Sequence, residues 1–517
     1  MKKTCCAILL SLSILLSLGT ICKEEKHHLK EARGLWVTRW EWAVKADTNR
    51  MLAQQARIRH IFELAKDARL NFILFQVRGN GDAFYQSPIE PWSDLLSDSL
   101  GADPGWDPLA FAVELAHELG LELHAWFNTF PAWRGHEPPP HTTPEHVYHR
   151  HPEWLVCDKN GQPMPLGDHY VSLSPGIPEV RDYLQQVALD IVTRYDIDGI
   201  HFDYIRYPES ADKLGYSQDP ISLFLFNSEQ GNPQNLSWEN WQRENINQFV
   251  RQFYDRATAA KPWLKISAAV IGKYDQSDWN GYHAVFQDAR RWLSEGKMDF
   301  IVPMIYWPTN HPTAPYGKIV DDWFNWPHER FIFPGMMVNS LGSEQWPTDE
   351  LFNQVAINRR NGNGMVFFSY SGLEKASQLV SQKKGFVFLA NLPPMTWKDD
   401  VPPMDPQHLR AEILNSGQII LRWSPPLPKL EPSDVFHYNI FRSEKSPVDF
   451  LDAENLIHVT AKPDTFYIDA SAKPGRTYHY VVTALDRVGN ESPPSNQAAV
   501  ALPVLAVAPS SLEITAP

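Results

Sequence analysis

The sequence predicts an α/β protein in which a closed (β/α)8 TIM barrel is followed by a small all-β sandwich. From about residue 31 to residue 395, eight short apolar runs alternate with amphipathic helical patterns. Apolar strands separated by helices are typical of a parallel sheet covered on both faces, and eight such repeats can close a barrel. An open doubly wound sheet is the structural alternative, but no Gly-rich turn follows the first run.

The eight apolar runs are the expected strands of the barrel. They lie at 33–38, 71–77, 121–127, 197–203, 264–271, 299–306, 331–338 and 364–370. The expected helices cover 51–69, 108–119, 178–195, 238–260, 283–294, 318–325, 349–360 and 372–382, and Pro178 suits a first helical turn. Two long connections, 128–177 and 204–237, follow the third and fourth strands, on the side where barrel enzymes keep their active sites.

The N-terminus has the pattern of a secretory signal. Lys2 and Lys3 precede an apolar run of about 14 residues, too short to span a bilayer comfortably. We therefore expect residues 1–22 to be a signal peptide and the protein to be exported to the periplasm or cell envelope. Cys22 could carry a lipid tether, although Ile21 before it is a poor fit for lipidation. The net charge of -14, without a basic stripe, argues against nucleic acid as a partner.

Beyond the barrel, expected at 31–395, the composition changes. Residues 396–402 belong to a Pro-rich stretch and are expected to form a linker, and residues 504–517 look like a tail. Between them, residues 403–503 contain short alternating strands with Trp423 in a core position and Tyr478 near the start of a late strand. This segment resembles a fibronectin type III domain, in which a buried Trp and a corner Tyr recur.

Polar and aromatic side chains end several of the expected barrel strands. His201 and Asp203 lie on the same side of the fourth strand because strand side chains alternate, and Asp203 is its last residue. A charge at this position is costly unless it has partners or a function. The same alternation places polar or aromatic residues at the ends of other expected strands. Gln76 and Arg78 end the second strand, with Asp82 in the loop after it, and His124, Trp126 and Asn128 share one face of the third. Tyr306 and Trp307 end the sixth strand, and the loop after the fifth contains Asp275 and Asp278. Together they predict a polar cleft at the strand ends.

Several of these segments together resemble one family. They are "EARGLWVTRW", "FQVRGNGDAFYQSPIEPWS", "HAWFN", "DGIHFDYIRYP" and "PMIYW". The set is similar to the bacterial glycoside-hydrolase-like barrel family related to glycosyl hydrolase family 10, whose exported members include a divisome-localised hydrolase of peptidoglycan glycan strands. The family often has a second acidic residue directly after the position of Asp203, where this chain has Tyr204. The resemblance implies hydrolysis of a polysaccharide, with peptidoglycan glycan as the expected substrate.

Glycoside hydrolysis usually uses two carboxyl groups around an oxocarbenium-like transition state. We expect Asp203 to be the nucleophile or charge stabiliser. The general acid should be less solvated than Asp203; Asp275 and Asp82 are the candidates, Asp275 slightly favoured, with Glu90 and Asp278 also possible. No cofactor or metal is expected. The expected substrate-binding residues are His201, Arg206, Gln76, Arg78, His124, Trp126, Asn128, Tyr306 and Trp307.

Three alternatives remain open from the sequence. The first is a non-catalytic glycan-binding barrel, which would keep the aromatic residues without needing a carboxyl pair. The second is a metal-dependent hydrolase with His201 and Asp203 as ligands, although the first strand lacks the His-x-His pair usual in such barrels. The third is an adhesion or scaffolding role carried by the C-terminal module.

Overall fold

The computed structural model describes residues 29–45, 49–276, 278–344, 346–347, 349–379, 386–426, 435–461 and 463–504. The expected signal peptide at 1–22, including Cys22, and the tail beyond Val504 lie outside these residues. Among the helices that are described, none has both the length and the apolar character needed to cross a membrane.

Eight parallel strands close into a barrel, which confirms the fold class expected from the alternating pattern. In barrel order they are β1 (Ala32–Val37), β2 (Phe72–Arg78), β3 (Glu122–Asn128), β6 (Gly199–Asp203), β7 (Lys265–Ile271), β8 (Phe300–Ile305), β10 (Gly335–Met337) and β11 (Gly364–Phe368). The ring is closed because β10 pairs with both β8 and β11, and β11 pairs with β1. A short strand, β9 (Phe331–Ile332), also pairs with β8 and precedes β10.

Helices surround the ring, and local signals set their ends. Asp107 caps α4 (Pro108–Leu119) by accepting a hydrogen bond from the Ala110 N–H at 3.0 Å, and Ser237 caps α9 (Trp238–Ala260). Both helices have the bounds expected from the sequence. The other long helices are α3 (Arg50–Asp67), α6 (Pro178–Arg194), α12 (Tyr316–Phe324), α13 (Glu350–Asn361) and α14 (Tyr370–Leu379).

One expected helix, at 283–294, is wrong. The chain forms two short helices there, α10 (Gly281–Ala284) and α11 (Ala289–Ser294). Phe286, between them, has a φ of 55°, which a right-handed helix cannot contain. The helical spacing of apolar residues spans the break, so the pattern alone did not reveal it.

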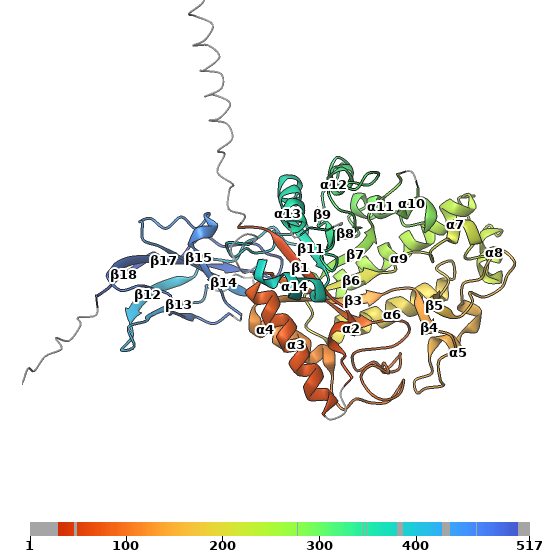
Figure 1. Ribbon diagram of the computed structural model, residues 1–517, viewed down its shortest axis with the longest axis horizontal. Coiled ribbons are helices and arrows are strands. Elements are labelled where there is room, and N and C mark those ends of the chain that lie inside the picture. The colour runs from red at the N-terminus through yellow and green to blue at the C-terminus, as the bar shows by residue number, and fades with distance from the viewer. Residues whose placement is uncertain are drawn as a thin grey trace, which may run out of the picture.

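The long connection after β3 folds into a wall of its own. It contains an antiparallel pair, β4 (Pro131–Gly135) and β5 (Gly167–Ser172), with the short helix α5 (Val147–Arg150) between them. The connection after β6 carries α7 (Ala211–Leu214) and α8 (Pro220–Phe226). Both connections extend from the carboxyl ends of the strands, on the right in Figure 1.

The C-terminal strands form a two-sheet sandwich. One sheet contains β12 (Gln407–Ile413), β13 (Ile419–Ser424) and β16 (Phe466–Asp469), and the other contains β15 (Leu456–Val459), β14 (His437–Ser443), β17 (Arg476–Leu485) and β18 (Ala498–Leu502). Trp423 is buried against Tyr438, and the Tyr478 hydroxyl accepts a hydrogen bond from the Lys473 N–H at 3.0 Å. These are the core tryptophan and the tyrosine corner expected of a fibronectin type III-like fold.

The sandwich lies against the end of the barrel where the strands begin, opposite the β4–β5 wall (Figure 1). Val488, in the loop after β17, is buried in the same apolar cluster as Phe72 and Trp36 of the barrel interior. Lys265, the first residue of β7, donates to the Arg487 carbonyl at 2.7 Å. Trp397, within the expected linker 396–402, donates to Asp299 at the base of β8 at 2.8 Å.

Candidate active site

Asp203 occupies the carboxyl end of β6, where the strand gives way to the long connection. Its side chain is 7% exposed. The next residue, Tyr204, has a φ of 50°, a left-handed conformation that costs a non-glycine residue free energy. This turn brings the Tyr204 N–H back to Asp203 Oδ1 at 2.6 Å. The backbone therefore fixes the orientation of the carboxyl group at the open end of the barrel.

Burial makes Asp203 a weaker acid than an ordinary aspartate. Desolvation raises its pKa to about 6, against a smaller lowering by the Arg206 charge, the Tyr204 N–H and the Trp126 indole. A carboxyl group whose pKa is raised to about 6 keeps its proton to higher pH than an ordinary aspartate and can donate it to a leaving group, which is the property of a general acid. This environment fits the acid role better than the nucleophile role expected from the sequence.

Asp275 has the opposite environment, which corrects the expectation that it would be less solvated than Asp203. Its side chain is 49% exposed and lies 4.0 Å from Arg290. Asp82 is buried and accepts a hydrogen bond from the Asn80 N–H at 2.8 Å. Neither carboxylate is among the groups whose charge shifts the pKa of Asp203. The catalytic roles expected for Asp275 and Asp82 therefore gain no support from contact with Asp203.

The two reserve candidates are engaged elsewhere. Glu90 has no exposed side-chain surface and forms an ion pair with Arg78 at 2.7 Å. Asp278 is 73% exposed, with Lys273 at 3.7 Å. Glu90 is a structural residue in this arrangement, because its carboxylate neutralises a fully buried arginine.

His201 lies on the same face as Asp203, as expected, but it cannot contact a substrate. The ring is fully buried; Nε2 accepts a hydrogen bond from the Trp36 indole at 3.0 Å, and Nδ1 bonds the Ser267 hydroxyl at 2.9 Å. Since the indole can only donate, Nδ1 carries the proton. Burial also holds the pKa of His201 well below its usual value. The expected substrate-binding role is wrong, because both nitrogens are used inside the barrel.

The substrate-binding role expected for Arg78 is also wrong, because a β-bulge in β2 turns its side chain to the outer face of the barrel. The pairing of β2 with β3 shifts after Gln76, so Gln76 lies opposite Trp126 whereas Arg78 lies opposite Phe127. Trp126 belongs to the cluster inside the barrel and Phe127 to the cluster beneath the helices. Arg78 therefore points outward to Glu90, away from any substrate. Gln76 remains on the inner face, where its side-chain oxygen accepts from the Arg39 N–H at 3.0 Å.

The three expected substrate-binding residues of β3, His124, Trp126 and Asn128, lie at different depths inside the barrel. His124 is fully buried low in the barrel, packed over Gly199, where an added Cβ would lie 2.3 Å from the ring, so its expected contact with substrate is wrong. Trp126 lies higher, and its indole lowers the pKa of Asp203. Asn128 pairs with Asp203 across the strands and donates to the Gly79 carbonyl at 3.0 Å. The buried Asn128 Oδ1 has no hydrogen-bond partner in the described part of the chain.

Tyr306 and Trp307 follow β8 and are both partly exposed, as stacking residues need to be. Burial raises the pKa of Tyr306 well above its usual value and the charge of Asp203 adds to this effect, so the two side chains are near each other. Tyr306 also packs on Phe368 with ring centroids 5.4 Å apart, and Lys273 lies 5.3 Å from the centre of the Trp307 ring. Their substrate-binding role stays a prediction.

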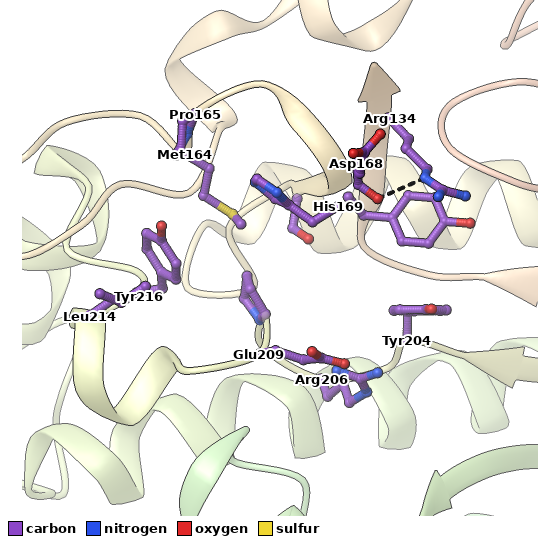
Figure 2. A pocket seen from close by; sticks show the side chains of 13 residues that line it. Arg134, Met164, Pro165, Asp168, His169, Tyr204, Arg206, Glu209, Leu214 and Tyr216 are labelled. Carbon is purple, nitrogen blue, oxygen red and sulfur yellow. Dashed lines mark hydrogen bonds between the residues drawn. The ribbon is translucent and has the colours of Figure 1, made fainter. Parts of the chain in front are cut away.

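A cavity of about 590 Å³ lies between the β4–β5 wall and the connection after β6; Tyr204, the residue after Asp203, lines it, whereas Asp203 itself does not. Figure 2 shows Tyr204 and Arg206 on one side, with Arg134, Asp168 and His169 facing them. The Arg206 guanidinium stacks 4.7 Å from the centre of the Tyr204 ring. The remaining lining residues are Met164, Pro165, Tyr170, Ser172, Pro208, Glu209, Leu214 and Tyr216.

Sequence reasoning predicted Arg206 here but missed the two carboxylates of the cavity, Asp168 and Glu209. Both lie in long connections, where no strand or helix period relates a residue to the strand ends. The available signal was the length of the two connections, 128–177 and 204–237, because long loops in a compact domain are often functional.

Comparison with known proteins shows the family to which the barrel belongs. Residues 31–345 match the model of the family described as Glycosyl hydrolase-like 10. The chain belongs to this family. A relative from Bacillus subtilis, "Glycosyl hydrolase YngK", is 28% identical over 500 residues, covering 90% of this chain and 93% of the relative. "Glycosyl hydrolase DigH" of Escherichia coli is 29% identical over 320 residues, covering 56% of this chain and 69% of its own.

Among solved structures, the α-L-fucosidase isoenzyme 2 of Paenibacillus thiaminolyticus matches 69% of this chain and 49% of its own at 14% identity, with a TM-score of 0.46.

Proposed function

We propose that this protein is a glycoside hydrolase that cleaves O-glycosidic bonds in a polysaccharide, with Asp203 as its general acid. The observation that carries the proposal is the buried carboxyl group at the end of β6, with a pKa raised to about 6, directly before Tyr204, which lines a cavity of about 590 Å³ together with Tyr170 and Tyr216. Barrel enzymes place their catalytic groups at this end of the strands. Aromatic rings suit the C–H faces of sugars.

The second carboxyl group is proposed to be Glu209. It lines the cavity, it is exposed, and its charge acts on Tyr204 together with that of Asp203. An exposed carboxylate at this position can activate a water molecule or attack the sugar directly, while Asp203 protonates the leaving oxygen. The separation between the two carboxyl groups during the reaction decides between inversion and retention of the anomeric configuration.

The proposed substrate is the glycan strand of peptidoglycan, reached after export to the periplasm or cell envelope. Two features support this choice: the signal-like pattern at residues 1–22, and the resemblance of the strand-end motifs to a family with a peptidoglycan-glycan hydrolase. The relatives named above are called glycosyl hydrolases, which supports the reaction class without specifying the sugar.

The test is digestion of peptide-free glycan strands by the full chain, with products identified by mass. General acid catalysis contributes about 10²–10⁴-fold, so Asp203→Asn should lower kcat by that order, and Glu209→Gln should also be strongly impaired. Asp275→Asn is the matched control, because its half-exposed carboxylate lies outside the proposed pair and the variant should retain activity. Full activity of Asp203→Asn would exclude Asp203 as the acid.

One observation favours a second candidate, a non-catalytic glycan-binding barrel. No carboxylate is among the groups that shift the pKa of Asp203, whereas many glycosidases hold their two carboxyl groups close together. In that case the wild-type chain would bind glycan strands and release no products.

The metal-dependent hydrolase is disfavoured because His201 is not available as a ligand: Trp36 and Ser267 occupy both of its ring nitrogens.

A further inference from the structure

Arg206 differs from every other buried arginine among the described residues. Six arginines are buried, and five of them donate hydrogen bonds: Arg33, Arg39, Arg78, Arg181 and Arg243. Arg206 is 7% exposed, yet its guanidinium has no hydrogen bond and no ion pair within 4 Å in the described part of the chain, and its Nε is buried without a partner. A buried charge of this kind is costly unless something else pairs with it.

The surroundings of Arg206 hold its guanidinium in place and leave it available to a ligand. Its flat face stacks on the Tyr204 ring, which in turn packs against Tyr170 with centroids 5.0 Å apart. All three side chains line the cavity of about 590 Å³, and Figure 2 shows Arg206 beside Tyr204 on one wall. A guanidinium stacked on a ring keeps its in-plane N–H groups free to donate, and their spacing matches the two oxygens of a carboxylate.

The acids near Arg206 do not neutralise it. The charge of Arg206 lowers the pKa of Asp203, but the two side chains form no ion pair within 4 Å. Glu209 lines the cavity and is exposed to solvent. The Asp168 side chain is 90% exposed and lies 3.1 Å from His136. These carboxylates would repel a doubly charged phosphate more strongly than a group with a single charge. One guanidinium in this setting therefore suits one carboxylate.

We propose that the cavity binds an acidic saccharide and that Arg206 pairs with its carboxylate. The inference rests on the proposed function, because it specifies the substrate class of the same site. Two sources share this chemistry: a lactyl ether on an amino sugar, and the ring carboxylate of a uronic acid. The tyrosine walls would contact the sugar faces while the carboxylate supplies the counter-charge that the chain itself does not provide at Arg206.

The test compares ligands that differ in this one group. The full chain carrying Asp203→Asn, which is expected not to consume its ligands, is titrated with lactyl-bearing glycan oligomers, with the same oligomers after reduction of the carboxyl group to an alcohol, and with oligouronates. Hydrogen bonds to charged groups predict that a carboxylated ligand binds about 10–100-fold more tightly than its reduced form. Tight binding of only the lactyl or only the uronate ligand identifies the source. Equal affinity for the carboxylated and the reduced oligomers overturns the inference without any substitution at Arg206.

Adding Arg206→Gln should bring the affinity ratio close to one and leave binding of the reduced oligomer nearly unchanged. Arg410→Gln, which removes one positive charge from an exposed position on the sandwich, is the matched control and should preserve the ratio. A ratio that survives Arg206→Gln overturns the inference. Turnover by the wild-type chain separates the two proposals: equal hydrolysis of both oligomers refutes only the carboxylate preference, whereas selective binding without hydrolysis refutes only the hydrolase.

Discussion

Replacing Asp203 by Asn should stabilise the protein at neutral pH while it removes the proposed acid. The carboxyl group is 93% buried, and burial raises its pKa to about 6 from an ordinary value of 3.8. The folded chain therefore holds an ionised group in a poorly solvated site whenever the pH exceeds about 6. An amide of nearly the same shape can accept the Tyr204 N–H in the same way and does not ionise.

The magnitude follows from proton linkage. As the pH rises from 4, the unfolded chain releases the Asp203 proton first, so the free energy of unfolding decreases until the folded chain has also lost its proton, above about pH 6. The full difference between a pKa of about 6 and one of 3.8 corresponds to about 3 kcal/mol, of which about 2–3 kcal/mol lies between pH 4 and pH 7.5. The stability of Asp203→Asn relative to wild type should rise by that amount over this range.

Urea unfolding of both chains at pH 4 and pH 7.5 measures the change, and taking the difference between them cancels the other titrating groups. Asp275→Asn is the control, since its side chain is half exposed and should show no comparable change. The reasoning is refuted if the difference in unfolding free energy between Asp203→Asn and wild type stays constant within about 0.5 kcal/mol from pH 4 to pH 7.5. That result would mean that burial does not raise the pKa of Asp203.

Three further outcomes are expected. Arg206→Gln should move the alkaline limb of the pH dependence of kcat/KM to higher pH, because Arg206 lowers the pKa of Asp203; an unmoved limb would contradict the acid role. Glu90→Gln should lower the free energy of unfolding by about 3–5 kcal/mol, since it leaves the fully buried Arg78 without its carboxylate, and a loss below about 1 kcal/mol would speak against this pairing. Val488→Ala should destabilise the barrel as well as the sandwich, by about 1–3 kcal/mol, because Val488 fills the barrel interior from below; thermal unfolding in which only the sandwich transition moves would contradict the shared core.

Much of the fold could be predicted because it depends on short-range patterns. The bounds of α4 and α9 follow from a capping residue and a helical period, both contained within a few neighbouring residues. Asp203 could be placed at a strand end for the same reason. Arg78 could not be placed, because one bulge in β2 changes the face on which every later residue of the strand lies.

The expected linker and the role of the C-terminal module show the same limit. Composition predicted a Pro-rich connection and a separate sandwich, but neither revealed that Val488 and Arg487 close the base of the barrel. These contacts join residues that lie far apart along the chain, and no local period reports them. The packing indicates that the module contributes to the stability of the barrel.

The sequence by itself determined the alternation of strands and helices, the change to a sandwich after the barrel, and a carboxyl group at the end of β6, since each depends on spacing between near neighbours. Only the tertiary structure decided which polar residues are satisfied and which are free. His201 accepts a hydrogen bond from Trp36, 165 residues away, while Arg206 has no hydrogen-bond or ion-pair partner among the residues that the structure describes. Hydrogen bonding and desolvation depend on distances between remote segments, and those distances exist only after the barrel has closed.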